Sequence, residues 1–296
     1  AVDARCPIEP TFACAGLMQP DKVKKPLHVL SLGAGVQSSC LALMAKHGEI
    51  DLPIDACIFA DTGGEPASVY SYLDFLEKEL PFPVYKVMHK EGLTKAIEDA
   101  TDGTANRLSN PPFYTLNDGE VGLLGRRCTS DFKINPIKRK IRELLGYKKG
   151  QRIPDGSCVQ LIGISLDEIQ RMKASQDNWV ENIYPLVDLR MRRGDCLEWM
   201  KRNGYPEPPR SACVYCPYHS DHEWRTVKQD KAGWDEAVRI DKLIRNGTAG
   251  TTSKLFLHSS GTPLDEVDLS TDVDRGQMTL FNAGVGALEC EGMCGV

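Results

Sequence analysis

Eleven cysteines stand in this 296-residue sequence, and five of them have neighbours that suggest chemistry. An odd number of cysteines argues against a closed framework of disulfides. In a reducing compartment, grouped cysteines more often bind a metal or carry sulfur. The five candidates are Cys128, Cys213, Cys216, Cys290 and Cys294.

The turn Cys213-Val-Tyr-Cys216 brings two thiols together. This geometry suits a tetrahedral metal or an iron–sulfur cluster, and further ligands must come from elsewhere in the chain. Cys128 follows two arginines, whose charges favour a thiolate. The competing interpretation is a structural zinc held by these three cysteines and His219.

Two further cysteines, Cys290 and Cys294, lie in an acidic, glycine-containing tail. We expect them to act as a mobile thiol arm that carries sulfur as a persulfide or exchanges a disulfide. The alternatives are incidental cysteines of a disordered tail and two additional metal ligands.

A second chemical candidate is the segment Ser31-Leu-Gly-Ala-Gly-Val-Gln-Ser-Ser39, which joins a predicted strand to a predicted helix. Its glycines let an anion approach the backbone closely, and the start of the helix offers free N–H groups. Neither the dinucleotide pattern Gly-x-Gly-x-x-Gly nor the Walker pattern Gly-Lys-Ser/Thr is present. The alternative is therefore an ordinary turn between a strand and a helix.

Strands and helices alternate around these candidates. Apolar runs predict strands over residues 27–32, 55–60, 83–88 and 158–164, and helical spacing predicts helices over 36–47, 66–80, 136–145 and from 167. This order predicts an α/β fold, a Rossmann-like parallel sheet with helices on both faces. Ligands of such sheets bind at the carboxyl ends of the strands. Residues 102–124, rich in Asn, Pro and Gly, are expected to form a loop near the site.

Five segments together resemble a known family. Gly33-Ala34-Gly35-Val36-Gln37-Ser38 is similar to the PP-loop, Ser-Gly-Gly-x-Asp-Ser, of the ATP pyrophosphatase (adenine nucleotide alpha hydrolase-like) superfamily. Four more segments resemble its phosphoadenosine phosphosulfate (PAPS) reductase branch: Asp61-Thr-Gly63, Cys128 with Lys133 and Pro136, Gly163 to Arg171, and Cys213 to Cys216. Two positions depart from the pattern, because Gln37 replaces the usual Asp and Arg127 replaces the second cysteine of the cluster-bearing reductases.

The resemblance implies a nucleotide-binding catalytic domain over residues 27–225, between an N-terminal extension, 1–26, and a helical, acidic C-terminal extension, 226–296. ATP and magnesium would be bound there. The residues implied for the phosphates are Gly33, Ala34, Gly35, Gln37, Ser38 and Ser39. Asp61 and Gly63 would lie near the ribose and adenine, unless Asp61 only caps a helix. Gly163, Asp167 and Arg171 would lie near metal-bound phosphate, unless the acid only favours a helix start.

The resemblance also makes Cys128 the third ligand beside Cys213 and Cys216. Three cysteines around a [4Fe–4S] cluster leave one iron open, and sulfur-inserting members of the superfamily are thought to hold the transferred sulfur there. Because Arg127 removes the fourth thiolate, we expect an ATP-dependent sulfur transferase with Cys128, Cys290 and Cys294 as catalytic residues. It would adenylate an acceptor carbonyl oxygen and replace that oxygen with sulfur, taken from sulfide or from a cysteine desulfurase persulfide.

Two alternatives remain open at this point, a PAPS or adenylylsulfate reductase that releases sulfite and a regulatory nucleotide-binding protein with a structural zinc. The net charge is −5, yet residues 126–152 hold ten Lys and Arg against two acids. This basic block is expected either to contact a phosphorylated small-molecule or nucleic-acid acceptor or to be a solvated helix face. The sequence has no apolar stretch near the length of a membrane span and no export signal, so we expect a cytoplasmic protein. A homodimer is among the expected partners.

Overall fold

The computed structural model describes the chain except residues 1–24, 91, 106–110, 118 and 272–296. Cys290 and Cys294 therefore lie outside the described residues, and their predicted roles stay predictions.

Five parallel strands form the central sheet in the order β3-β2-β1-β6-β7. Their bounds are β1 Leu27–Leu32, β2 Ala56–Asp61, β3 Val84–Met88, β6 Cys158–Ile162 and β7 Val180–Ile183. Val29 of β1 is paired with Ala56 on one side and with Gln160 on the other. The chain order reverses between β1 and β6, and the carboxyl ends of strands at such a reversal form a crevice for ligands.

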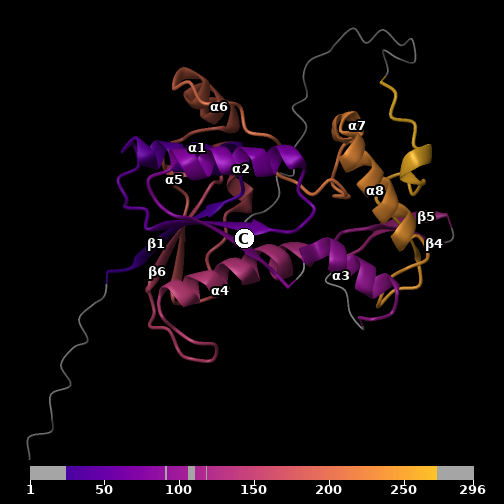
Figure 1. Cartoon of the computed structure of the whole chain (residues 1–296), viewed down its shortest axis with the longest axis horizontal. Helices are drawn as coiled ribbons and strands as arrows, with labels where there is room; N and C mark the ends of the chain where they lie inside the picture. The colour runs from indigo at the N-terminus through magenta and orange to yellow at the C-terminus, as the bar shows by residue number, and fades with distance from the viewer. Residues whose placement is uncertain (1–24, 91, 106–110, 118, 272–296) are drawn as a thin grey trace, which may run out of the picture.

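Helices cover both faces of this sheet (Figure 1). One face carries α1 (Val36–Lys46), α2 (Ala67–Glu79), α5 (Pro185–Asp188) and α6 (Arg193–Arg202) over a large apolar core. The other carries α4 (Asn135–Leu144), whose Ile137 and Ile141 pack against Val29 and Ile58. The predicted fold class, a Rossmann-like parallel sheet with helices on both faces, is confirmed.

Two short helical turns lie before α4 and after β6, and the second of them differs from the sequence expectation. A π-helical turn, η1 (Ser130–Ile134), precedes α4, and π-turns are frequent at functional sites. The expected strand over 158–164 ends at Ile162, and the helix expected from residue 167 is the 3₁₀ turn η2 (Leu166–Arg171).

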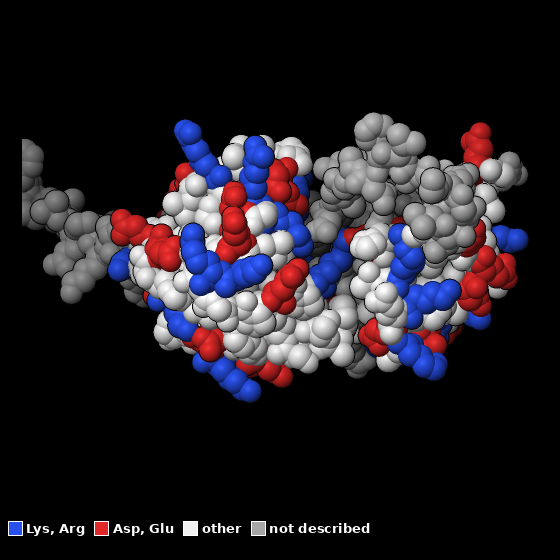
Figure 2. Space-filling model, turned by 90° about the horizontal axis from the view of Figure 1, so that it is seen from above, with Lys and Arg blue, Asp and Glu red and all other residues white. Residues whose placement is uncertain are grey.

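A second core lies beside the sheet. Its elements are α3 Gly92–Thr101, β4 Tyr114–Asn117, β5 Glu120–Leu123, α7 Asp221–Gln229, α8 Lys231–Ile244, β8 Lys254–Phe256 and the turn η3 Leu264–Glu266. The three strands form an antiparallel sheet, β5-β4-β8, and Phe113, Trp224 and Leu255 are buried beneath it. The hollow between this part and the parallel sheet is bordered by Lys and Arg side chains on the face seen from above (Figure 2).

The hairpin of β4 and β5 corrects the expectation of a loop over residues 102–124, because Thr115 pairs with Gly122. Its strands have four residues each, too few for an alternating pattern to stand out among turn-forming residues. The domain boundary after residue 225 stays a prediction, since residues on both sides of it share the second core. No helix in the described part of the chain is both long and apolar enough to cross a membrane.

Candidate active site

The loop from Gly33 to Ser39 follows β1 and ends in the first turn of α1. The Gly33 N–H donates to the Ser38 hydroxyl, 3.1 Å away, and the Ser38 hydroxyl faces the Gly35 carbonyl oxygen at 3.4 Å. Ala34 has a φ of 57°, so the chain turns sharply here. No side chain caps α1 at Gly35 and no acid lies in its first turn. The positive end of α1 is therefore left for an anion.

Gly163, directly after β6, packs against this loop. A Cβ atom at this position would lie 2.6 Å from the Ser38 nitrogen and 2.7 Å from its Cα atom. Only glycine lets the loops after β1 and β6 approach this closely. The structure thus places Gly163 beside the loop from Gly33 to Ser39, at the point where the strand order reverses.

Gln37 links the loop to η2. Its side-chain nitrogen donates to Glu168 Oε2 at 3.1 Å and lies 3.4 Å from the Ser165 hydroxyl. Its side-chain oxygen is buried and has no hydrogen-bond partner among the described residues. Glu168 is paired with Arg171, and burial raises the pKa of Glu168 while Arg171 opposes that rise.

Asp167 faces a different element, because its Oδ1 accepts a hydrogen bond of 3.2 Å from the backbone N–H of Arg193 at the start of α6. Arg171 therefore reaches the loop through Glu168 and Gln37, whereas the hydrogen bond that Asp167 accepts leads to α6.

Asp61 ends β2 and shapes the turn that follows. Its Oδ1 accepts from the Gly63 N–H at 2.7 Å and from the Tyr70 hydroxyl at 2.8 Å. Gly63 has a φ of 75°, which favours glycine. These contacts give Asp61 a structural role in the turn, and Gly63 packs beside Met88 of β3 and Gly92 of α3.

The segment before and within the cysteine turn is bound directly to both of these loops. The Ser211 hydroxyl donates to the Gly33 carbonyl oxygen. The Val214 N–H donates to the Gly64 carbonyl oxygen at 2.8 Å. The loop from Gly33 to Ser39 and the cysteine turn therefore lie next to each other in the fold.

A buried polar chain continues from β2 into the cysteines. The Thr62 hydroxyl lies 3.1 Å from Cys213 Sγ and donates to Glu65 at 3.3 Å. Glu65 forms an ion pair of 3.3 Å with Lys133, and their side chains are 0% and 9% exposed. Burial, together with the charge of Glu65, raises the pKa of Cys213 well above its usual value, and Lys133 opposes this. Without a metal, Cys213 is therefore a protonated thiol at neutral pH.

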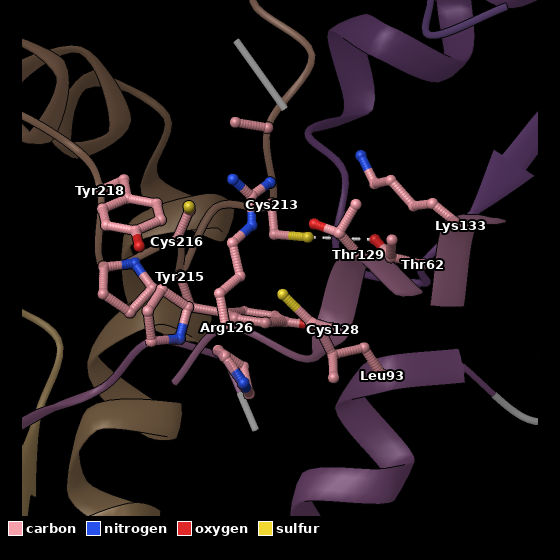
Figure 3. Close-up of a pocket in the computed structure, with 14 residues that line it drawn as sticks. Thr62, Leu93, Arg126, Cys128, Thr129, Lys133, Cys213, Tyr215, Cys216 and Tyr218 are labelled. Carbon is pink, nitrogen blue, oxygen red and sulfur yellow. Dashed lines mark hydrogen bonds between the residues drawn. The ribbon is translucent and has the colours of Figure 1, made fainter. Parts of the chain in front are cut away.

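Cys128, Cys213 and Cys216 line one pocket, drawn in Figure 3. In this view the sulfurs of Cys128 and Cys213 lie on one side of the Arg126 side chain and that of Cys216 on the other. Arg126 itself stacks on Tyr218, with its guanidinium carbon 5.5 Å from the ring centroid.

The cavity among these side chains measures about 40 Å³, room for a few water molecules. Among the described residues, no three His, Cys, Asp or Glu side chains are gathered as a metal-binding group. The three thiols match in kind the donors of zinc and of iron–sulfur clusters, and a cluster here requires Arg126 to move aside.

His219, the fourth ligand of the zinc alternative, does not line this pocket. Its Nε2 lies 3.0 Å from the Cys213 carbonyl oxygen, and its ring packs edge-on against Trp224 at 4.8 Å between centroids. Burial and the nearby Arg210 lower its pKa to about 4, so the ring is neutral.

Part of the basic block serves the local structure. Lys138 pairs with Asp177 at 2.5 Å, and Lys140 pairs with Glu143 at 2.7 Å. Arg142 donates to the Lys148 carbonyl oxygen and holds the loop after α4. These contacts favour the solvated-face interpretation for α4.

The sequence did not indicate Thr62 or Ser211 as site residues. Both are small hydroxyl residues in segments without periodicity, and their partners lie 151 and 178 positions away. The available signals were the place of Thr62 inside the Asp61-Thr-Gly63 segment and the adjacency of Ser211 to the cysteine turn.

No family model matches the chain, and no curated protein matches it either. Among solved structures, the chain is similar in fold to the PAPS reductase of Candida auris, determined as a phosphate complex. The two share 14% sequence identity with a TM-score of 0.40, over 63% of this chain and 77% of that one. The fold assignment of this chain rests on its own strand order and parallel pairing.

Proposed function

We propose that this chain is an ATP-dependent sulfur transferase. The acceptor carbonyl oxygen attacks the α-phosphorus of ATP, pyrophosphate leaves, and hydrosulfide then displaces AMP from the adenylated carbon. The product is a thiocarbonyl, and no step changes an oxidation state. The observation that carries the proposal is the direct hydrogen bonding of the cysteine segment to the phosphate loop, between Ser211 and Gly33.

The phosphate half of the proposal rests on the start of α1. Its backbone N–H groups, its dipole and the Ser38 hydroxyl converge at the carboxyl end of β1, and no acid opposes an anion there. Fixed donors of this kind stabilise charge on a transferring phosphate more strongly than mobile water does. The unpartnered Gln37 side-chain oxygen supplies an acceptor for a magnesium-bound water or a ribose hydroxyl.

The sulfur half rests on the pocket of three cysteines. Cys128, Cys213 and Cys216 would hold an iron–sulfur cluster, which when bound supplies an open iron as a site for sulfide. The chain's own part is to keep that site close to the nucleotide. The Thr62 hydroxyl orients Cys213, and Lys133 together with Arg126 offsets negative charge in the pocket.

The position before Cys128 favours transfer over reduction. Arg127 stands where the cluster-bearing reductases of the resembling family have a cysteine, so three thiols and not four reach the pocket. An incomplete thiolate set suits a cluster that binds sulfide at its open iron.

Replacing Cys128, Cys213 or Cys216 singly by Ser should remove bound iron. Anaerobically purified wild-type protein should contain about four irons and four sulfides per chain. Each variant should lose most of both, as measured by metal and sulfide analysis with a visible spectrum.

The matched control is Cys158→Ala, which removes a buried core cysteine of β6 whose pKa is raised to about 12 by burial. This variant should keep its iron. Colourless wild-type protein with one zinc, or iron that survives all three Ser replacements, would contradict the cluster assignment.

A further inference from the structure

A second cavity lies on the α4 face of the parallel sheet. It measures about 310 Å³ and is enclosed by η1, the first turn of α4, β6, β7 and the segment 173–176. Cavities of about 300–1,000 Å³ are the usual size of small-molecule sites. We call it the amide cavity, because Asn135, Gln160, Gln176 and Asn182 line it and no Asp or Glu does.

The floor of the amide cavity is polar where a parallel sheet is normally apolar. Gln160 of β6 is only 4% exposed and pairs in register with Asn182 of β7. Its side-chain nitrogen donates to the Ser31 hydroxyl of β1 at 2.6 Å. Parallel sheets covered on both faces are built mainly from apolar side chains, so a polar pair at this depth is unusual. These side chains therefore form a band of hydrogen-bonding groups beneath a space.

The mouth of the cavity carries the positive charge of Lys173, whose backbone is held in place. The backbone of Lys173 is held by Tyr184, which accepts from its N–H at 2.9 Å and donates to its carbonyl oxygen at 2.6 Å, and by Asn182, which donates at 3.1 Å. Among the described residues Lys173 makes no ion pair, whereas Lys138 is neutralised by Asp177. One unbalanced cation and several neutral amides suit a ligand with one anionic group and a hydrogen-bonding body.

The amide cavity adjoins the cysteine pocket through one element. Ser130 and Ile134 of η1 line the amide cavity, while Thr129 and Lys133 of the same stretch line the cysteine pocket. The amide cavity and the cysteine pocket are therefore neighbours that share the stretch from Thr129 to Ile134.

We propose that the amide cavity binds a nucleoside monophosphate and that this nucleotide is the acceptor for sulfur. Gln160 and Asn182 match the donor and acceptor edges of a base, as carboxamides do in base recognition, and Lys173 matches the phosphate. The claim that this nucleotide accepts sulfur rests on the proposed function. The claim that the cavity binds a nucleotide rests only on the residues that line the cavity.

The test is equilibrium dialysis of the full chain with CMP, UMP and GMP, each in the presence of saturating ATP and magnesium. Glucose 6-phosphate and inorganic phosphate serve as probes without a base. At least one nucleotide should bind at one per chain and should not be displaced by ATP. Lys173→Met, at an exposed position, should weaken it about 10-fold, the typical worth of a charge-assisted hydrogen bond.

Asn182→Leu, which changes a neutral floor residue, should weaken the same nucleotide and leave inorganic phosphate unaffected. Lys149→Met is the matched control and should bind as wild type, because Lys149 is an exposed lysine that does not line the cavity. Equal binding of glucose 6-phosphate or phosphate, displacement by ATP, or no effect of Lys173→Met would each overturn the proposal.

The two claims fail separately. If the protein does not consume ATP but still binds a nucleotide in a Lys173-dependent way, the proposed function is wrong and the ligand of the amide cavity is confirmed. If ATP binds and no nucleotide enters the cavity, the assignment of the acceptor falls.

Discussion

Gly163→Ala is expected to reduce the affinity for ATP about 100-fold, the loss of one or two hydrogen bonds to a charged group. The added methyl group would lie 2.6 Å from the Ser38 nitrogen, a contact that forces the phosphate loop away from β6. Gly163 has no positive φ, so the effect comes from space and not from backbone strain. Isothermal titration calorimetry with ATP and magnesium measures the loss.

Overpacking also lowers the free energy of unfolding, by roughly 1–3 kcal/mol, so binding is compared at a temperature where both proteins are folded. The matched control is Gly194→Ala at the start of α6, where a Cβ atom has no neighbour within 4 Å. This control should bind ATP as wild type. Unchanged ATP affinity in Gly163→Ala would show that the nucleotide does not use this loop.

Lys133→Met is expected to lower the free energy of unfolding by about 3–5 kcal/mol, the usual result of removing one partner of a buried ion pair. Glu65 is fully buried, and its charge would remain without the ammonium group 3.3 Å away. Urea denaturation followed by tryptophan fluorescence measures the change.

The double variant Glu65→Gln/Lys133→Met removes both charges and should regain most of the lost stability. The surface pair Lys231–Asp235 gives the control, because Lys231 is 86% exposed and Lys231→Met should cost about 0.5 kcal/mol or less. A double variant as unstable as the single one would mean that Lys133 acts through contacts other than Glu65.

The sheet could be predicted because local pattern determines it. The apolar run that ends at Leu32 and the glycine-rich turn after it specify a buried strand followed by a helix, and the same alternation repeats through β6. The β4–β5 hairpin could not be predicted in this way. Its Thr115–Gly122 pairing and its place in the second core depend on β8, about 140 residues later.

The site, like the fold, has features that depend on local sequence and features that depend on long-range contacts. Glycine positions such as Gly35 and Gly163 carry a local sequence signature, and the structure places both at the strand reversal. The contacts that unite the site are long-range, since Thr62 and Cys213 are 151 residues apart. The amide cavity could not be predicted from the sequence. Gln160 lies inside an apolar run, and only the pairing of its strand with the neighbouring strands shows that it lines a cavity.

We propose that ATP drives replacement of oxygen by sulfur at this site. The most direct measurement incubates the anaerobic protein with ATP, magnesium, sulfide and a mixture of nucleoside monophosphates and total tRNA, and follows AMP, pyrophosphate, sulfite and thiolated product by mass spectrometry. We expect AMP, pyrophosphate and thiocarbonyl product in equal amounts, with no sulfite. A parallel incubation replaces ATP and sulfide by PAPS or adenylylsulfate and a dithiol reductant. Sulfite released there, with ATP left unconsumed in the first incubation, would contradict the sulfur transferase.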